Sequence, residues 1–258
     1  MTEELNDGAE RLRALHHGER PLVLPNVWDA AGAAVVAGAG FPAVATTSAA
    51  VAESLGYPDH EGAPAEEMFA AAGRIAAAVD VPVTADVEAG YGLSPAELTR
   101  RLIEAGVVGC NLEDSDHWAG GLVRAETQAN RVAALRSAAT AAGVNLVINA
   151  RVDVFVQEWG DPAERLAEAI RRGNLYLDAG ADCVYPILAP DTETIGTLTA
   201  ELKGPVNVLS RRGGPSLEEL ARLGVARVSY GSGIHRVAMR ALRQVVATIA
   251  EGGDPFPR

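Results

Sequence analysis

Short apolar runs alternate with longer amphipathic, alanine-rich segments from residue 21 almost to the C-terminus. The runs are rich in β-branched residues and bounded by turn residues, which is typical of buried strands in a parallel sheet. Eight such runs are present: PLVLPN at 21–26, PAVATTS at 42–48, VPVTADVE at 81–88, VGCNLED at 108–114, NLVINARVD at 145–153, DCVYPIL at 182–188, PVNVLS at 205–210 and ARVSYG at 226–231.

The segments between the runs carry helix signals. In SPAE and SLEE, Ser94 and Ser216 are expected to be N-caps, with Glu97 and Glu219 closing capping boxes. Eight regular strand and helix units predict the α/β class and a (β/α)8 TIM barrel, spanning about 21–232 of a single domain, 1–258. A doubly wound open sheet is the alternative. It is less favoured because no Gly-rich nucleotide turn follows the first strand.

A last apolar segment with regularly spaced arginines follows the eighth run, and it predicts a helix at about 233–250. This helix is either the eighth barrel helix or an extra one used in oligomer contacts. The sequence leaves both possibilities open.

Charge and composition narrow the class of function. The net charge of -12 and the pI near 4.9 argue against nucleic acid or an anionic membrane surface as partner. No apolar stretch approaches the roughly 20 residues that span a bilayer, and the charged N-terminus is unlike a signal peptide. Cys110 and Cys183 lie in apolar runs, which is typical of free thiols in a reducing compartment, so the cytoplasm is expected.

The single lysine also excludes one chemistry. A Schiff-base aldolase needs a lysine at the carboxyl end of a strand, whereas Lys203 precedes the seventh run.

Acidic residues collect where three consecutive predicted strands end. Asp86 and Glu88 are two positions apart and share one side of their strand, and Glu113 ends the next strand with the parity of Asn111. Barrel active sites lie at this rim, where carboxylates crowded together would repel one another unless a cation is present. An all-oxygen cluster favours Mg²⁺ or Mn²⁺.

Arg151, in the fifth strand, either pairs with Asp153 or grips a substrate carboxylate with its planar fork. His117, in the loop after the fourth strand, is a candidate general acid, although a lone histidine in a loop is more often simply solvated. The glycines of SRRGGPS and YGSG would suit either tight turns or phosphate binding by a metal-free isomerase.

Several phrases together resemble the isocitrate lyase and phosphoenolpyruvate mutase superfamily, in particular its short mutase-like branch. They are the opening LVLPNVWDAAGAAVVAGAGFPAVATTSAAVAESLGYPD, the turn DVEAGYG, and then NLEDS, NARVD, GADCVYP and GPVNVL in order.

The resemblance implies roles for particular residues. Metal ligation is implied for Asp86, Glu88 and Glu113, and catalytic roles for Arg151 and Asp59, with His117 as a possible proton donor. Binding of the substrate carboxylate and 2-oxo oxygen is implied for Thr47 and Ser48, and Asn207 and Tyr185 are further candidates for contacts with a small carboxylic acid. Family members are homotetramers or dimers of tetramers, so a tetramer or dimer is expected.

The chain departs from the lyases of this superfamily in one loop. They carry a catalytic cysteine in a K-x-C-G-H motif after the fourth strand, where this chain reads EDSDHWAGGLV. Decarboxylation or retro-aldol lysis through a metal-stabilised enolate is the favoured reaction. Carbon-phosphorus chemistry and a catalytically silent binding protein are the alternatives.

Overall fold

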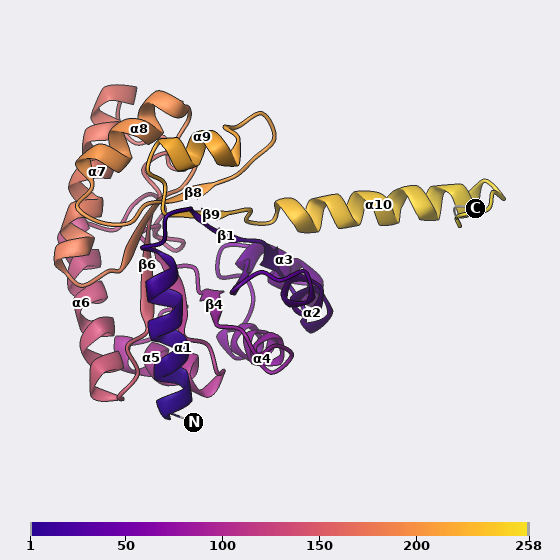
Figure 1. Cartoon of the computed structure of the whole chain (residues 1–258), viewed down its shortest axis with the longest axis horizontal. Coiled ribbons are helices and arrows are strands. Elements are labelled where there is room, and N and C mark those ends of the chain that lie inside the picture. Colours follow the sequence, from indigo (N-terminus) through magenta and orange to yellow (C-terminus); the bar gives the residue numbers. More distant parts are fainter. Residues whose placement is uncertain (1, 257–258) are drawn as a thin grey trace.

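The computed structural model describes residues 2–256, in which parallel strands form a barrel surrounded by helices (Figure 1). The strands are β1 (Leu22–Leu24), β2 (Asn26–Val27), β3 (Val44–Thr46), β4 (Val83–Asp86), β5 (Gly109–Glu113), β6 (Val147–Val152), β7 (Cys183–Pro186), β8 (Asn207–Leu209) and β9 (Arg227–Ser229). All eight predicted strands are therefore confirmed.

The first predicted strand is divided at Pro25, which has no N–H to donate to a ladder. Its first half, β1, pairs with β9, and its second half, β2, pairs with β3. A single bridge between Val184 and Val206 joins β7 to the start of β8. The ring of eight strand positions is thereby closed, and the (β/α)8 barrel is confirmed.

The helices are α1 (Thr2–Leu15), α2 (Ala30–Gly38), α3 (Ser48–Leu55), α4 (Ala65–Ala76), α5 (Pro95–Glu104), α6 (Ala125–Ala141), α7 (Pro162–Asp178), α8 (Thr192–Glu201), α9 (Leu217–Arg222) and α10 (Gly233–Ala250). The capping box at Ser216 and Glu219 is confirmed. The one at Ser94 is wrong in its second half, because the Glu97 carboxylate binds Arg100 and Arg101 on the helix surface instead.

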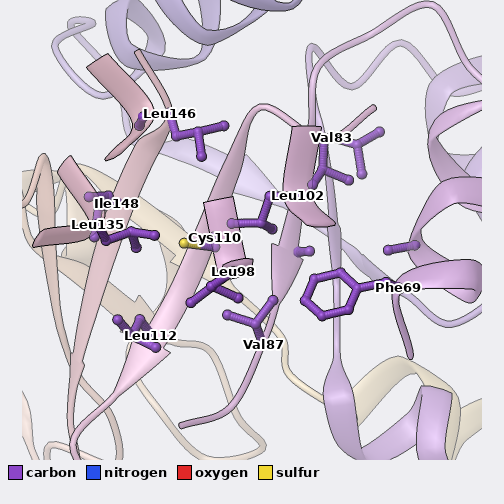
Figure 2. Packing of buried hydrophobic residues seen from close by; sticks show 14 of the residues in the cluster. Phe69, Val83, Val87, Leu98, Leu102, Cys110, Leu112, Leu135, Leu146 and Ile148 are labelled. Carbon is purple, nitrogen blue, oxygen red and sulfur yellow. The ribbon is translucent and has the colours of Figure 1, made fainter. Parts of the chain in front are cut away.

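Apolar side chains between the strands and the outer helices form the largest core cluster (Figure 2). Val83, Ala85 and Val87, the neighbours of the β4 acidic residues, belong to it. Helix α1, which the strand pattern does not reveal, closes the amino-terminal end of the barrel by packing Ala9 and Leu12 against strand residues. The acidic residues are thus directed away from the core and toward the opposite rim.

Helix α10 extends away from the barrel, as the yellow helix of Figure 1 shows. His235 is its one buried residue, whereas its apolar side chains are largely exposed: Val237, Leu242, Val245, Val246 and Ile249. It is therefore not an eighth helix packed on the barrel wall. Within residues 2–256, no helix has the length and apolarity needed to cross a membrane.

Candidate active site

A cavity of about 240 Å³ opens at the carboxyl ends of the strands. Its acidic lining residues come from β4 and the turn that follows it, from β5 and from the loop between α3 and α4: Asp59, Asp86, Glu88 and Glu113. Arg151 on β6 and Arg236 on α10 also line it. A cavity of this size suits a small molecule.

Asp86 is held by the start of helix α3, although 38 residues separate it from Ser48. The backbone N–H and Oγ of Ser48 both donate to Asp86 Oδ2, at 3.1 and 2.8 Å. The other oxygen, Oδ1, is buried without a hydrogen-bond partner among residues 2–256. One oxygen of Asp86 is therefore anchored by the protein and the second is available to a ligand.

The two carboxylate oxygens of Glu88 also differ in their partners. The N–H of Glu61 donates to Glu88 Oε2 at 2.6 Å, and Oε1 is buried with no partner in the described chain. Glu88 lies beyond the end of β4 in a left-handed conformation, with φ of 50°. Such a backbone is strained for a residue other than glycine and is often found at functional sites.

Glu113 and Arg151 form a buried charged cluster. Arg151 Nη1 lies 2.5 Å from Glu113 Oε2, and its Nε and Nη2 donate to Asp153 at 2.6 and 2.9 Å. His117 Nε2 lies 2.6 Å from Glu113 Oε1. All three guanidinium nitrogens of Arg151 therefore contact carboxylates of the protein itself.

Burial governs the proton affinities here. It raises the pKa of Glu88 to about 7, and the nearby charges of Asp86, Asp59 and Glu113 act in the same direction. Burial also raises the pKa of Glu113, although Arg151 and His117 oppose the shift. The hydrogen bond that His117 donates to the Glu113 carboxylate raises the pKa of His117, which favours the imidazolium form.

Beneath the cavity, an arginine crosses the barrel interior. Arg227 on β9 is fully buried, and its Nη2 donates to Asn111 on β5 at 3.2 Å. Asn149 donates to the same oxygen at 2.8 Å. This polar layer forms the floor of the site.

The predicted site residues fall into two groups. Those that line the cavity are Thr47, Ser48, Asp59, Asp86, Glu88, Glu113, Arg151 and Tyr185. His117 and Asn207 are not lining residues: His117 reaches the site through Glu113, and Asn207 is buried in the barrel interior, where it accepts a hydrogen bond from Ser229.

Asn26 and Arg236 are among the lining residues that the sequence reasoning missed. Asn26 accepts hydrogen bonds from the N–H groups of Tyr230 and Gly231 and donates to the carbonyl of Thr46, so it joins three strands at the rim. Arg236 lies in an apolar helical pattern that suggests no ligand contact. The sequence feature that could have identified Arg236 as a cavity residue is its position just after the eighth strand, at the rim where barrel active sites lie.

The donor set fits a divalent cation. In the described residues no three His, Cys, Asp or Glu side chains are gathered as a preformed metal cluster. Mg²⁺, however, is commonly bound by one or two carboxylates, with water and substrate completing its shell. Asp86 Oδ1 and Glu88 Oε1, both buried and without a donor, match this requirement.

We expect replacement of Glu88 by glutamine to stabilise the metal-free protein at alkaline pH. The pKa of Glu88 is about 7 in the folded protein and 4.5 ordinarily. The free energy of unfolding of the wild type therefore falls as pH rises from 4.5 to 7 and is constant above that range. The substitution removes this loss. Its benefit should therefore be small near pH 4.5 and reach on the order of 3 kcal/mol above pH 7.

Urea unfolding with a chelator at pH 5 and pH 8 measures this difference. Glu19→Gln, at an exposed site, is the control and should change stability little at either pH. A benefit from Glu88→Gln that is equal at both pH values, or larger at pH 5, would contradict the assigned burial effect.

Comparison with known proteins places this arrangement in a family. The phosphoenolpyruvate phosphomutase family model matches residues 12–250. An uncharacterised protein of Mycobacterium tuberculosis is 33% identical over 245 residues, covering 95% of this chain and 90% of that protein. The 2-methylisocitrate lyase of Halalkalibacterium halodurans is 29% identical over 258 residues, covering 95% and 83%.

A solved structure agrees with these matches. Oxaloacetate acetylhydrolase in complex with its product oxalate superposes with a TM-score of 0.86 at 26% identity, covering 97% of this chain and 89% of that one. The predicted resemblance to the isocitrate lyase and phosphoenolpyruvate mutase superfamily is confirmed. This chain belongs to the phosphoenolpyruvate phosphomutase family.

Proposed function

We propose that this protein is a lyase dependent on Mg²⁺ or Mn²⁺ that cleaves a carbon-carbon bond of a small 2-oxo or 2-hydroxy carboxylic acid. The observation that carries the proposal is the pair Asp86 and Glu88, each anchored through one oxygen and open through the other. The names of the relatives, a 2-methylisocitrate lyase and an oxaloacetate acetylhydrolase, support carbon-carbon cleavage.

Asp86 and Glu88 would hold the cation through their open oxygens, and Glu113, whose two oxygens contact Arg151 and His117, would complete the site through water. When bound, Mg²⁺ supplies Lewis-acid stabilisation of the negative charge that develops on the substrate during bond cleavage. Ser48, whose two donors contact Asp86, would set the direction of that carboxylate. These contacts give Ser48 a positioning role in addition to the predicted substrate contact.

Other residues would bind and protonate the substrate. Thr47 lines the cavity, and its hydroxyl would donate to the substrate carboxylate. Asp59 and Tyr185 line the same space. Arg151 would orient the reacting end. His117, which does not line the cavity, would return a proton by way of Glu113 to the carbon left with the electron pair. Asn207 would support the floor.

The proposal is tested by measuring product release from oxaloacetate, 2-methylisocitrate, 2,3-dimethylmalate and phosphonopyruvate with Mg²⁺ or Mn²⁺. We expect turnover of at least one of the carbon-carbon substrates, and its loss with a chelator. Turnover of phosphonopyruvate alone would favour the alternative of carbon-phosphorus cleavage. Metal-dependent oxalate binding without any turnover would favour a silent binding protein.

We further propose that α10 is an oligomer contact of a homotetramer or homodimer. The helix carries three arginines and no acidic residue, whereas the whole chain has a net charge of -12, so a second copy is the complementary partner.

Two buried free thiols support a reducing compartment, and the cytoplasm is proposed as the location.

Charge on the apolar face of α10 is expected to dissociate the oligomer. Leu242 and Val246 are 51% and 55% exposed, and glutamates at both positions would prevent the burial of this face against a partner. Light scattering coupled to size exclusion should show a smaller assembly for the double variant. Gln244→Glu, on the other side of the helix, should leave the mass unchanged. A monomeric wild type would refute the assignment.

A further inference from the structure

The cavity is divided into an acidic and a cationic side. Glu113 ends β5, and Arg236 follows β9. In the closed ring these two strands are four positions apart out of eight, and therefore face each other across the barrel. The acidic carboxylates surround the β4 to β6 side, and Arg236 stands on the opposite side.

Arg236 differs from the other cavity arginine in its partners. Arg151 contacts protein carboxylates through all three nitrogens of its guanidinium group. Arg236 donates to Ser232 Oγ at 2.6 Å, and none of the carboxylates in residues 2–256 lies within ion-pair distance of it. Arg236 is thus the lining arginine whose charge remains available to an anionic ligand.

The first turn of α10 holds Arg236 in place. The adjacent His235 is buried, packs edge-on against Trp28 with ring centroids 4.8 Å apart, and lies 3.5 Å from Glu53. Arg236 itself is exposed, and its Nη1 donates to Ser232 Oγ, another residue that lines the cavity. A fixed first turn reduces the entropy lost when the arginine binds a ligand.

Apolar side chains occupy the wall near Arg236. Ile187, Leu188 and Leu209 line the same cavity. Leu188 has φ of 62°, a strained conformation for this residue type, and its placement in the wall agrees with the occurrence of such strain at ligand sites. This surface suits the hydrocarbon part of a ligand that joins two polar ends.

We propose that Arg236 determines specificity by binding the distal carboxylate of a dicarboxylic 2-oxo acid, whose chelating end lies at Asp86 and Glu88. The inference rests on the proposed function and adds the substrate class to it. A carboxylate is favoured as the distal group because its planar geometry matches the guanidinium fork, in which two parallel hydrogen bonds can form.

Isothermal titration with Mg²⁺ tests this inference without requiring turnover. The probes are oxalate, which has only the chelating end, and 3,3-difluorooxaloacetate, which adds a distal carboxylate. Arg236→Gln should weaken difluorooxaloacetate binding by about 10-fold or more, as expected for loss of a charge-assisted hydrogen bond. Oxalate affinity should change less than about 2-fold, and Arg236→Lys should be intermediate for the larger probe.

Arg240→Gln is the matched control, since Arg240 is exposed one turn along α10 and does not line the cavity. It should bind both probes like wild type. Equal binding of difluorooxaloacetate by wild type and Arg236→Gln would overturn the inference while leaving the lyase proposal intact. Failure of wild type to bind either probe with Mg²⁺ or Mn²⁺ would overturn both.

Discussion

Asp86→Asn is expected to abolish Mg²⁺-dependent oxalate binding and turnover. The substitution keeps an oxygen that can accept from Ser48 but removes the charge that the cation requires. Losing an outer-shell partner typically lowers metal affinity roughly 10- to 100-fold, and loss of a direct ligand should exceed that range. Calorimetry with Mg²⁺ and oxalate measures the binding, and the substrate panel measures the turnover.

Asp80→Asn provides a matched comparison, because Asp80 is exposed just before the same strand, at the opposite rim. It should bind oxalate and Mg²⁺ like wild type. The Asp86→Asn protein should unfold at a temperature close to that of wild type, since its hydrogen bonds can persist. Oxalate affinity retained within about 2-fold by Asp86→Asn would show that Asp86 is not a metal ligand.

Arg151→Gln should produce the largest loss of stability. The change leaves fully buried Asp153 without its cationic partner and leaves Glu113, with 2% of its side chain exposed, with His117 alone. Removing one member of a buried charged cluster typically costs about 3–5 kcal/mol. Urea unfolding at pH 8 measures the loss, and oxalate titration on the remaining folded protein measures its effect on the site.

The pH dependence and a surface control make this prediction specific. The Arg151 charge lowers the pKa of Glu113, so its removal raises that pKa further above the unfolded value. The loss of stability should consequently grow as pH rises and shrink toward acid pH. Arg171 also contacts two carboxylates but is 49% exposed, and Arg171→Gln should cost less than about 1 kcal/mol.

A double variant separates this effect from a packing defect. If uncompensated charge causes the loss, Glu113→Gln should restore part of the stability in the Arg151→Gln protein, because the two residues are in contact. Additive losses would instead indicate that Arg151 acts through packing alone.

The barrel and the gathering of acidic residues could be predicted because both depend on local periodicity. Strand parity correctly brought Asp86 and Glu88 to one cavity, although Glu88 lies beyond the strand in a left-handed turn that alternation does not describe. Parity also separated Glu113 from Asp114, which points outward to Tyr176 and Arg172 on α7.

Contacts between distant segments could not be obtained in this way. The Ser48 to Asp86 and Glu61 to Glu88 hydrogen bonds span 38 and 27 residues, and they depend on loop conformations that no periodicity encodes. Arg236 was not predicted as a cavity residue because a charged residue every few positions on a helix usually indicates a solvated face. The strand division at Pro25 had a visible cause, yet the change of partner strand there is set by barrel closure.

Helix α10 joins the two proposals, because its first turn supplies Arg236 to the cavity and its later turns carry the exposed apolar face. If a second copy covers that face, assembly and ligand binding both require the same ordered helix. Assembly would then increase ligand affinity, and ligand binding would strengthen assembly by the same factor. Substrate affinity would then depend on protein concentration, falling on dilution as protomers separate, with no change to any residue of the cavity itself.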